Sequence, residues 1–126
     1  WPSSYDVLIT SNLFGDILTD EASVISGSMG LMPSASIGLD NALYEPIHGS
    51  YPEATGKQIA NPIASILSLS MMLEYSFNLK SESELINKAV EVSLTNRFTT
   101  PDLSMNSKAY TTKEIGDYIV DFIKKN

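Results

Sequence analysis

The sequence predicts an α/β protein, because short apolar runs typical of strands occur together with longer segments of helical periodicity. Contiguous Val, Leu and Ile at residues 7–9 suit a strand buried on both faces, as in a parallel sheet. Residues 81–94 and 111–123 place apolar side chains three and four positions apart, as amphipathic helices do. A chain of 126 residues is long enough for one modest domain with its own core.

The first expected elements are a strand over residues 5–11 and a helix directly after it. Ser11 or Asn12 can cap this helix, since both side chains accept hydrogen bonds from free backbone N–H groups. Gly27 and Gly30 are expected to end it, because glycine commonly terminates helices.

Two short extended segments are expected next, at residues 31–37 and 42–46, with a turn-prone stretch between them. A loop rich in Gly, Pro, Ser and Thr follows at residues 47–61. It is too long for a routine connection, and loops of this length in compact domains tend to be functional.

Asn61 is expected to cap a second helix, with Pro62 at its first position, where a missing N–H costs nothing. Apolar side chains cover much of this helix, which predicts deep burial, and its small residues allow neighbours to approach closely. The apolar residues are Ile63, Ile66, Leu67, Met71, Leu73 and Phe77.

The last two helices are expected to open with capping boxes, in which a hydroxyl and a glutamate three residues later satisfy each other's backbone N–H groups. The two motifs are Ser81-x-x-Glu84 and Thr111-x-x-Glu114. The first helix then buries Ile86, Ala89, Val90 and Leu94, and the second buries Ile115, Ile119, Phe122 and Ile123.

Composition bounds the class of protein and its partners. A hydrophobic content of 43% with 18% charged residues is typical of a globular chain rather than a disordered one. The net charge of −7 disfavours nucleic acid and anionic membranes as partners, since both bind basic patches. The absence of cysteine excludes disulfides and thiolate metal sites, and no apolar run approaches the ~20 residues that cross a bilayer.

Asp16 and Asp20 form a candidate metal site. On a helix, residues four apart lie on one face with Cβ atoms about 6 Å apart. Like charges at this spacing repel unless a cation lies between them, and Mg²⁺ or Mn²⁺ binds through such carboxylates together with water and substrate. A solvated pair favoured by the helix dipole is the alternative, although Ile17, Leu18 and Val24 predict a partly buried helix, where a carboxylate needs a partner.

The loop at residues 47–61 holds candidate ligand-binding groups. It contains neither a G-x-G-x-x-G fingerprint nor a Walker motif, so phosphate binding of the Rossmann or P-loop kind is absent. It offers glycines for close backbone approach, a hydroxyl for a phosphate, a flat imidazole, a carboxylate suited to a ribose diol and an amide suited to a purine edge. These are Gly49 and Gly56, Ser50, His48, Glu53 and Asn61. A purely structural role for the single histidine is the alternative.

Two long segments resemble a known family. They are residues 10–38, TSNLFGDILTDEASVISGSMGLMPSASIG, and residues 43–77, LYEPIHGSYPEATGKQIANPIASILSLSMMLEYSF. Both are similar to the C-terminal part of the isocitrate/isopropylmalate dehydrogenase family, and most similar to its 3-isopropylmalate branch. The likeness fades at residues 80–95 and returns at 99–103 and 111–123. It implies the C-terminal part of that family's α/β fold, which is not a Rossmann fold.

The resemblance implies an oxidative decarboxylation in leucine biosynthesis, carried out in the cytoplasm. The 2-hydroxyl of 3-isopropylmalate is oxidised with hydride transfer to NAD⁺, and the 3-carboxyl group then leaves as CO₂. Asp16 and Asp20 match the family's metal-binding aspartates, and Mg²⁺ or Mn²⁺ there acidifies the hydroxyl and takes up electrons during decarboxylation. The loop matches the segment that binds the adenosine half of NAD. The candidate cofactor-binding residues are His48, Gly49, Ser50, Tyr51, Glu53, Gly56, Lys57 and Asn61.

Two of these residues depart from the family's usual pattern. Tyr51 stands where Ala is usual, and Glu53 stands where Asp is usual. The carboxylate of Glu53 repels a 2′-phosphate, which favours NAD over NADP. Tyr51 can stack near adenine or fold onto the surface, and the sequence favours neither.

The resemblance also implies a piece of a longer protein. The chain opens on Trp1 rather than Met, and its only arginine is Arg97, whereas the family's substrate-clamping arginines, catalytic Tyr and Lys and third metal aspartate precede the matching region. Family members are homodimers with shared active sites, so the piece alone is expected to be inactive. Residues 1–33 are expected to belong to the substrate and dimer domain, and residues 34–126 to the NAD-binding domain.

Two other functions stay open from the sequence. One is a sister β-decarboxylating dehydrogenase that acts on isocitrate, homoisocitrate or tartrate, because these enzymes share the G-D-x-x-x-D and H-G-[ST]-x-P patterns. The other is a non-catalytic truncated chain or dimerisation piece, which the presence of a single arginine supports.

Overall fold

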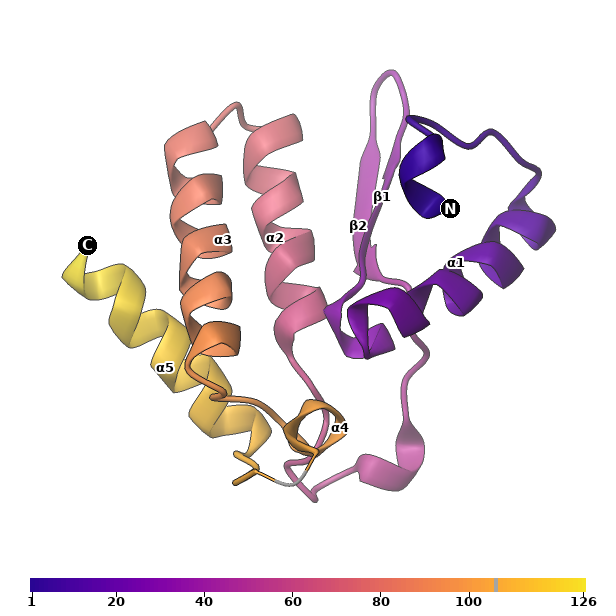
Figure 1. The fold of residues 1–126 in the computed structure, drawn as a ribbon. Coiled ribbons are helices and arrows are strands. Elements are labelled where there is room, and N and C mark those ends of the chain that lie inside the picture. The colour runs from indigo at the N-terminus through magenta and orange to yellow at the C-terminus, as the bar shows by residue number, and fades with distance from the viewer. Residues whose placement is uncertain (106) are drawn as a thin grey trace.

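The computed structural model describes residues 1–105 and 107–126 and has the α/β character predicted, with many helices and a small sheet (Figure 1). Three short 3₁₀ helices, η1 (Pro2–Ser4), η2 (Met29–Leu31) and η3 (Pro52–Ala54), lie between the longer elements. The longer elements in chain order are α1 (Asn12–Ser26), β1 (Pro33–Ile37), β2 (Ala42–Pro46), α2 (Ile63–Tyr75), α3 (Lys80–Thr95), α4 (Pro101–Ser104) and α5 (Thr112–Lys125).

The hydrophobic core lies where α2, α3 and α5 pack side by side (Figure 1). Each of these helices turns its predicted apolar face inward, and burial of one aliphatic side chain contributes about 1.5–3 kcal/mol. Small residues let α2 and α3 approach, and the Ser70 hydroxyl lies 2.8 Å from that of Ser83. Phe77 lies beyond the end of α2 and is 59% exposed, unlike its predicted neighbours. The buried core residues are Ile63, Ala89, Val90, Ile115 and Ile119.

The hairpin of β1 and β2 packs against α2. The strands are antiparallel, with Ala35 opposite Tyr44, and the turn closes through the Gly38 N–H, which donates to the Asn41 carbonyl at 2.9 Å. The extended segments predicted at 31–37 and 42–46 are confirmed, with the first strand starting two residues later.

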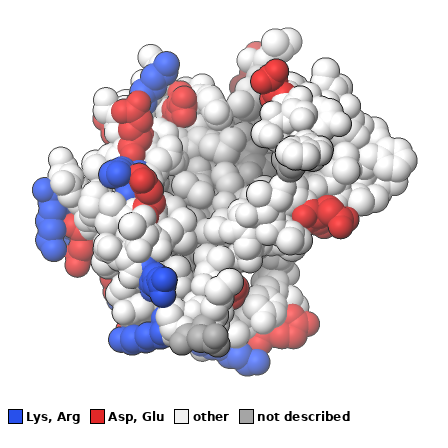
Figure 2. All heavy atoms as spheres, viewed as in Figure 1, with Lys and Arg blue, Asp and Glu red and all other residues white. Residues whose placement is uncertain are grey.

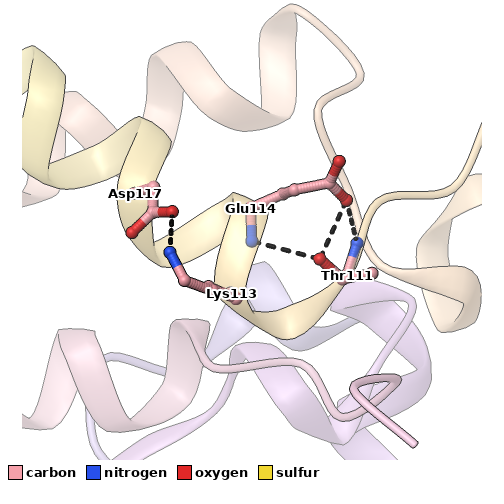
Figure 3. Close-up of polar contacts among 4 residues, drawn as sticks. All are labelled: Thr111, Lys113, Glu114 and Asp117. Atoms are coloured by element: carbon pink, nitrogen blue, oxygen red, sulfur yellow. Dashed lines mark hydrogen bonds and ion pairs between the residues drawn. The ribbon is translucent and has the colours of Figure 1, made fainter.

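One of the two predicted capping boxes forms. In α5 the Thr111 hydroxyl accepts from the Glu114 N–H, and the Glu114 carboxylate accepts from the Thr111 N–H at 2.8 Å (Figure 3). The prediction for Ser81 was wrong: α3 begins at Lys80, so Ser81 lies inside its first turn, and no side chain caps α3 in the described chain. The Leu79 N–H donates to the Leu73 carbonyl at 2.9 Å, and this tight link from α2 starts α3 early.

The predictions for the N-terminal segment were wrong in two respects. Residues 5–11 do not form a strand, and Val7, Leu8 and Ile9 are 77%, 65% and 96% exposed. A strand needs hydrogen-bonding neighbours, and β1 and β2 pair only with each other in the described sheet.

The burial predicted for α1 is also absent. Ile17, Leu18 and Val24 are 54%, 52% and 79% exposed, and the buried residue of α1 is Ser23. The reason is that α1 packs mainly against η2, whose three residues cover little of it. The predicted end of α1 is confirmed, because Gly27 adopts the left-handed conformation with a φ of 93°. Among the described residues, no helix is long and apolar enough to span a membrane.

Candidate functional site

The loop at residues 47–61 is held at both ends. At its start the Ile47 N–H donates to the Met32 carbonyl at 3.2 Å, which extends the hairpin. At its end Thr112, in the first turn of α5, donates through its hydroxyl to the Ala60 carbonyl at 2.5 Å and through its N–H to the Gln58 carbonyl at 2.9 Å. The loop therefore forms a fixed wall between the hairpin and the start of α2.

A cavity of about 410 Å³ lies against this wall, within the size range of small-molecule sites. The loop, the segment around η2 and α4 all contribute to its lining. Of the described residues, Glu53, Gly56 and Lys57 do not line it, so these three predicted cofactor residues lie apart from the rest. The predicted residues that line it are His48, Gly49, Ser50, Tyr51 and Asn61.

His48 and Gly49 leave room and hydrogen-bonding capacity for a ligand. The His48 Nδ1 lies 2.9 Å from the Gly49 carbonyl oxygen, whereas its Nε2 is buried and has no hydrogen-bond partner among the described residues. A Cβ added to Gly49 would meet no described atom within 4 Å. An orphaned ring nitrogen beside an open backbone fits a bound molecule with polar groups.

Asn61 uses both ends of its amide within the protein. Its Oδ1 accepts from the Ile63 N–H at 3.0 Å, so it binds the first turn as predicted, but Pro62 is the N-cap and α2 begins at Ile63, one residue later than predicted. Its Nδ2 donates to the Asp102 carboxylate at 3.0 Å. The loop pattern implied an Asn61 amide that is free for a ligand. In the structure, however, its oxygen already accepts a hydrogen bond from the start of α2.

Asp102 is a cavity residue that the sequence did not single out. Its carboxylate accepts from the hydroxyls of Ser28 at 2.5 Å and Thr100 at 2.6 Å, besides Asn61. Partial burial raises the pKa of Asp102, but these hydrogen bonds outweigh it and hold the pKa below the ordinary value. From the sequence, Thr-Pro-Asp reads as an ordinary helix start, with Pro101 and an acid in the first turn, so only the fold shows its partners.

Asp16 and Asp20 lie together on α1, as predicted, but in an exposed position. The Asn12 Nδ2 donates to the Asp16 carboxylate at 3.3 Å. Within residues 1–105 and 107–126, no group of three or more His, Cys, Asp or Glu is placed to hold a metal. The pair fits a divalent ion only with further ligands, as Mg²⁺ sites built on one or two carboxylates commonly require.

The charge around α1 favours a cation. Every Lys and Arg of the chain lies at or after residue 57, so α1 and the hairpin carry only acidic charges. Figure 2 shows Lys and Arg side chains over α3, α5 and the lower loops, whereas the α1 side shows acidic but no basic side chains. No basic side chain from the first 56 residues can therefore neutralise Asp16 and Asp20 in place of a metal.

A second, larger hollow of about 610 Å³ contains none of the predicted site residues. It lies between the end of α1 and the end of α3, and its walls include Leu31, Leu94 and Arg97. Its position separates it from both the loop cavity and the Asp16–Asp20 pair.

Comparison with known proteins decides the family. A family described as isocitrate/isopropylmalate dehydrogenase matches residues 1–119. The chain belongs to the isocitrate/isopropylmalate dehydrogenase family. The resemblance on which the sequence analysis relied is therefore confirmed.

Two individual relatives also match nearly the whole chain. The chain is 54% identical over 125 residues to the 3-isopropylmalate dehydrogenase of Bacteroides fragilis, covering 98% of this chain and 35% of that protein. It is 51% identical over 124 residues to the homoisocitrate dehydrogenase of Methanocaldococcus jannaschii, covering 98% of this chain and 35% of that protein.

A solved structure confirms the fold. The crystal structure of isocitrate dehydrogenase from Methylococcus capsulatus matches with a TM-score of 0.91 at 40% identity, over 98% of this chain and 36% of that one. The chain therefore spans about a third of the length of its relatives.

Proposed function

We propose that this chain is the C-terminal part of an NAD-dependent 3-isopropylmalate dehydrogenase of leucine biosynthesis, acting in the cytoplasm. The observation that carries the proposal is the 54% identity to such an enzyme over nearly the whole chain. The loop cavity supports it, because five of the predicted cofactor residues line one hollow.

The adenosine half of NAD is the proposed occupant of the cavity. The ring of His48 offers a stacking surface and an orphaned nitrogen, and the backbone at Gly49 allows a ligand to approach. Tyr51 lines the same hollow and is 54% exposed, so its ring is accessible to a ligand. Glu53 does not line the hollow, but it lies on η3, two residues after Tyr51, and its carboxylate would disfavour a 2′-phosphate on a ribose that extends toward η3.

Asp16 and Asp20 are the proposed ligands of Mg²⁺ or Mn²⁺, completed by the substrate and by groups of the full-length protein. Such an ion supplies Lewis-acid stabilisation of the negative charge that develops on the substrate oxygen. The two carboxylates hold it on the exposed side of α1, where the proposed homodimer forms. Their position on one helix fixes their separation.

A second candidate is homoisocitrate dehydrogenase, because the relative from M. jannaschii is 51% identical over 98% of this chain. Homoisocitrate and 3-isopropylmalate share the 2-hydroxy acid and the 3-carboxyl group, and they differ in the substituent at the 3-position. The identities of 54% and 51% are too similar to separate the two substrates.

The test is NADH formation by the full-length protein that contains this chain, with Mn²⁺ and with 3-isopropylmalate, homoisocitrate or isocitrate as substrate. We expect turnover with 3-isopropylmalate and a loss of at least about a hundredfold in Asp16→Asn and Asp20→Asn, with partial recovery at high Mn²⁺. Asp121→Asn, on the exposed side of α5, is the matched control and keeps full activity. A preference for homoisocitrate would show that homoisocitrate, not 3-isopropylmalate, is the substrate. Unchanged activity in both α1 variants would show that Asp16 and Asp20 do not bind the metal.

A further inference from the structure

Asp102 ties together three parts of the cavity wall that lie far apart in the sequence. One carboxylate oxygen accepts from both the Ser28 hydroxyl and the Asn61 amide, and the other accepts from the Thr100 hydroxyl. Ser28 in turn accepts from the Gly30 N–H at 3.0 Å. Asp102 thus connects the segment before η2, the start of α2 and the start of α4 at the rim of one hollow.

This arrangement permits only one orientation of the Asn61 amide. With Oδ1 on the Ile63 N–H and Nδ2 on the carboxylate, every contact pairs a donor with an acceptor. Turning the amide over would place its oxygen against the carboxylate and its NH₂ against the Ile63 N–H, so that both contacts become repulsive. A hydrogen bond to an ionised acceptor is also stronger than a neutral one.

One donor of Asn61 is then left over. A side-chain amide nitrogen carries two hydrogens, and only one is used by Asp102. The Asn61 oxygen already accepts from the Ile63 N–H, whereas the second amide hydrogen has no partner among the described residues and is available to a ligand in the cavity. The fixed orientation of the amide therefore favours a donor role for Asn61 at a purine edge, through the N–H that Asp102 does not use.

We propose that Asp102 is a positioning residue, which orients the Asn61 amide so that its remaining N–H donates to an acceptor on the adenosine half of NAD. The inference rests on the proposed function, because it takes NAD as the ligand. It assigns Asp102 no contact with the reacting atoms.

The test is NADH binding to the full-length protein, followed by NADH fluorescence, for wild type and Asp102→Asn. We expect the dissociation constant to rise about tenfold in the variant, whereas the dissociation constant for nicotinamide mononucleotide, which lacks the adenosine half, stays the same. In turnover, KM for NAD⁺ rises with little change in kcat at saturating NAD⁺. Asp117→Asn, whose carboxylate pairs with Lys113 on α5 (Figure 3), is the control and binds NADH normally.

A second variant shows whether Asp102 acts through Asn61. Asn61→Ser keeps an oxygen that can cap α2 but removes the amide donor. We expect Asn61→Ser alone to weaken NADH binding and the added Asp102→Asn change to have no further effect. Equal losses from Asp102→Asn in both backgrounds, or no loss in either, would overturn the inference while leaving the proposed function intact. If the wild-type protein binds no NADH, both fall together.

Discussion

At the scale of single residues, Gly30 shows how closely the cavity wall is packed. A Cβ at this position would lie 2.6 Å from the Cβ of Asn61, which real structures essentially never allow. We expect Gly30→Ala to destabilise the full-length protein by about 1–3 kcal/mol, through overpacking, and to weaken NADH binding by displacing Asn61.

The matched control for Gly30 is Gly116→Ala in α5, where an added Cβ would meet no described atom within 4 Å. Alanine inside a helix is favoured over glycine by about 1 kcal/mol, so we expect this variant to be more stable than wild type. Urea denaturation of both variants checks the prediction, and a shift of the same sign in both would contradict it.

Asp102 also predicts a pH dependence of stability. Its folded-state pKa lies below the ordinary value of 3.8, so its contribution is fully present above that value and is lost as the pH falls through the lower folded pKa. We expect Asp102→Asn to be less stable than wild type at neutral pH and the difference to shrink at the most acidic pH that the fold tolerates. Urea unfolding of both proteins at several pH values measures this, and a difference independent of pH would contradict it.

The sequence predicted the part of the candidate site that one contiguous motif supplies. The residues from His48 to Tyr51 are contiguous, so one motif places all of them along one wall. Asp102 lies 41 positions after Asn61, and no local pattern distinguishes its carboxylate from an ordinary charge in a first helical turn. Ser28 was not predicted for the same reason, because its partner Asp102 lies 74 positions away in the sequence.

At the scale of elements, the start of α5 is secured by its own side chains. Thr111→Ala removes the hydroxyl that accepts from the Glu114 N–H at 3.2 Å, and we expect a loss of about 0.5–2 kcal/mol. Ser81→Ala is the matched control, because Ser81 belongs to the same sequence pattern but lies inside α3 and caps nothing in the described chain. Thermal unfolding compares the two, and an equal loss in Ser81→Ala would show that the box is not the cause.

Local patterns predicted the long helices and the two hairpin strands, but they wrongly added a strand at residues 5–11. A helix satisfies its backbone within its own residues, so the amphipathic periodicity of α3 and α5 was enough to find them. A strand depends on neighbours, and the apolar run at residues 7–9 says nothing about whether they are present. The hairpin was predictable because its two strands are adjacent in sequence and supply each other's partners.

At the scale of the whole molecule, α1 and the segment before it carry about half of the exposed large apolar side chains. The core at α2, α3 and α5 is closed, whereas α1 and the segment before it expose large apolar side chains. Exposed apolar patches of this kind mark interaction surfaces in folded proteins. Because the chain spans about a third of its relatives, this surface is where the rest of the protein and the proposed partner subunit have apolar surface to cover.

Val24 offers a test of the proposed homodimer, because it is 79% exposed and lies two helical turns after Ile17 on the same face of α1. In the full-length protein, Val24→Asp would place an unpaired carboxylate in an apolar interface, so we expect the dimer dissociation constant to rise at least about tenfold. Sedimentation velocity over a range of concentrations measures it. Val120→Asp is the control, because Val120 is 47% exposed on α5, on the opposite side of the molecule (Figure 1). Wild-type association in Val24→Asp, with its fold intact by circular dichroism, would mean that this face of α1 is not the interface between subunits.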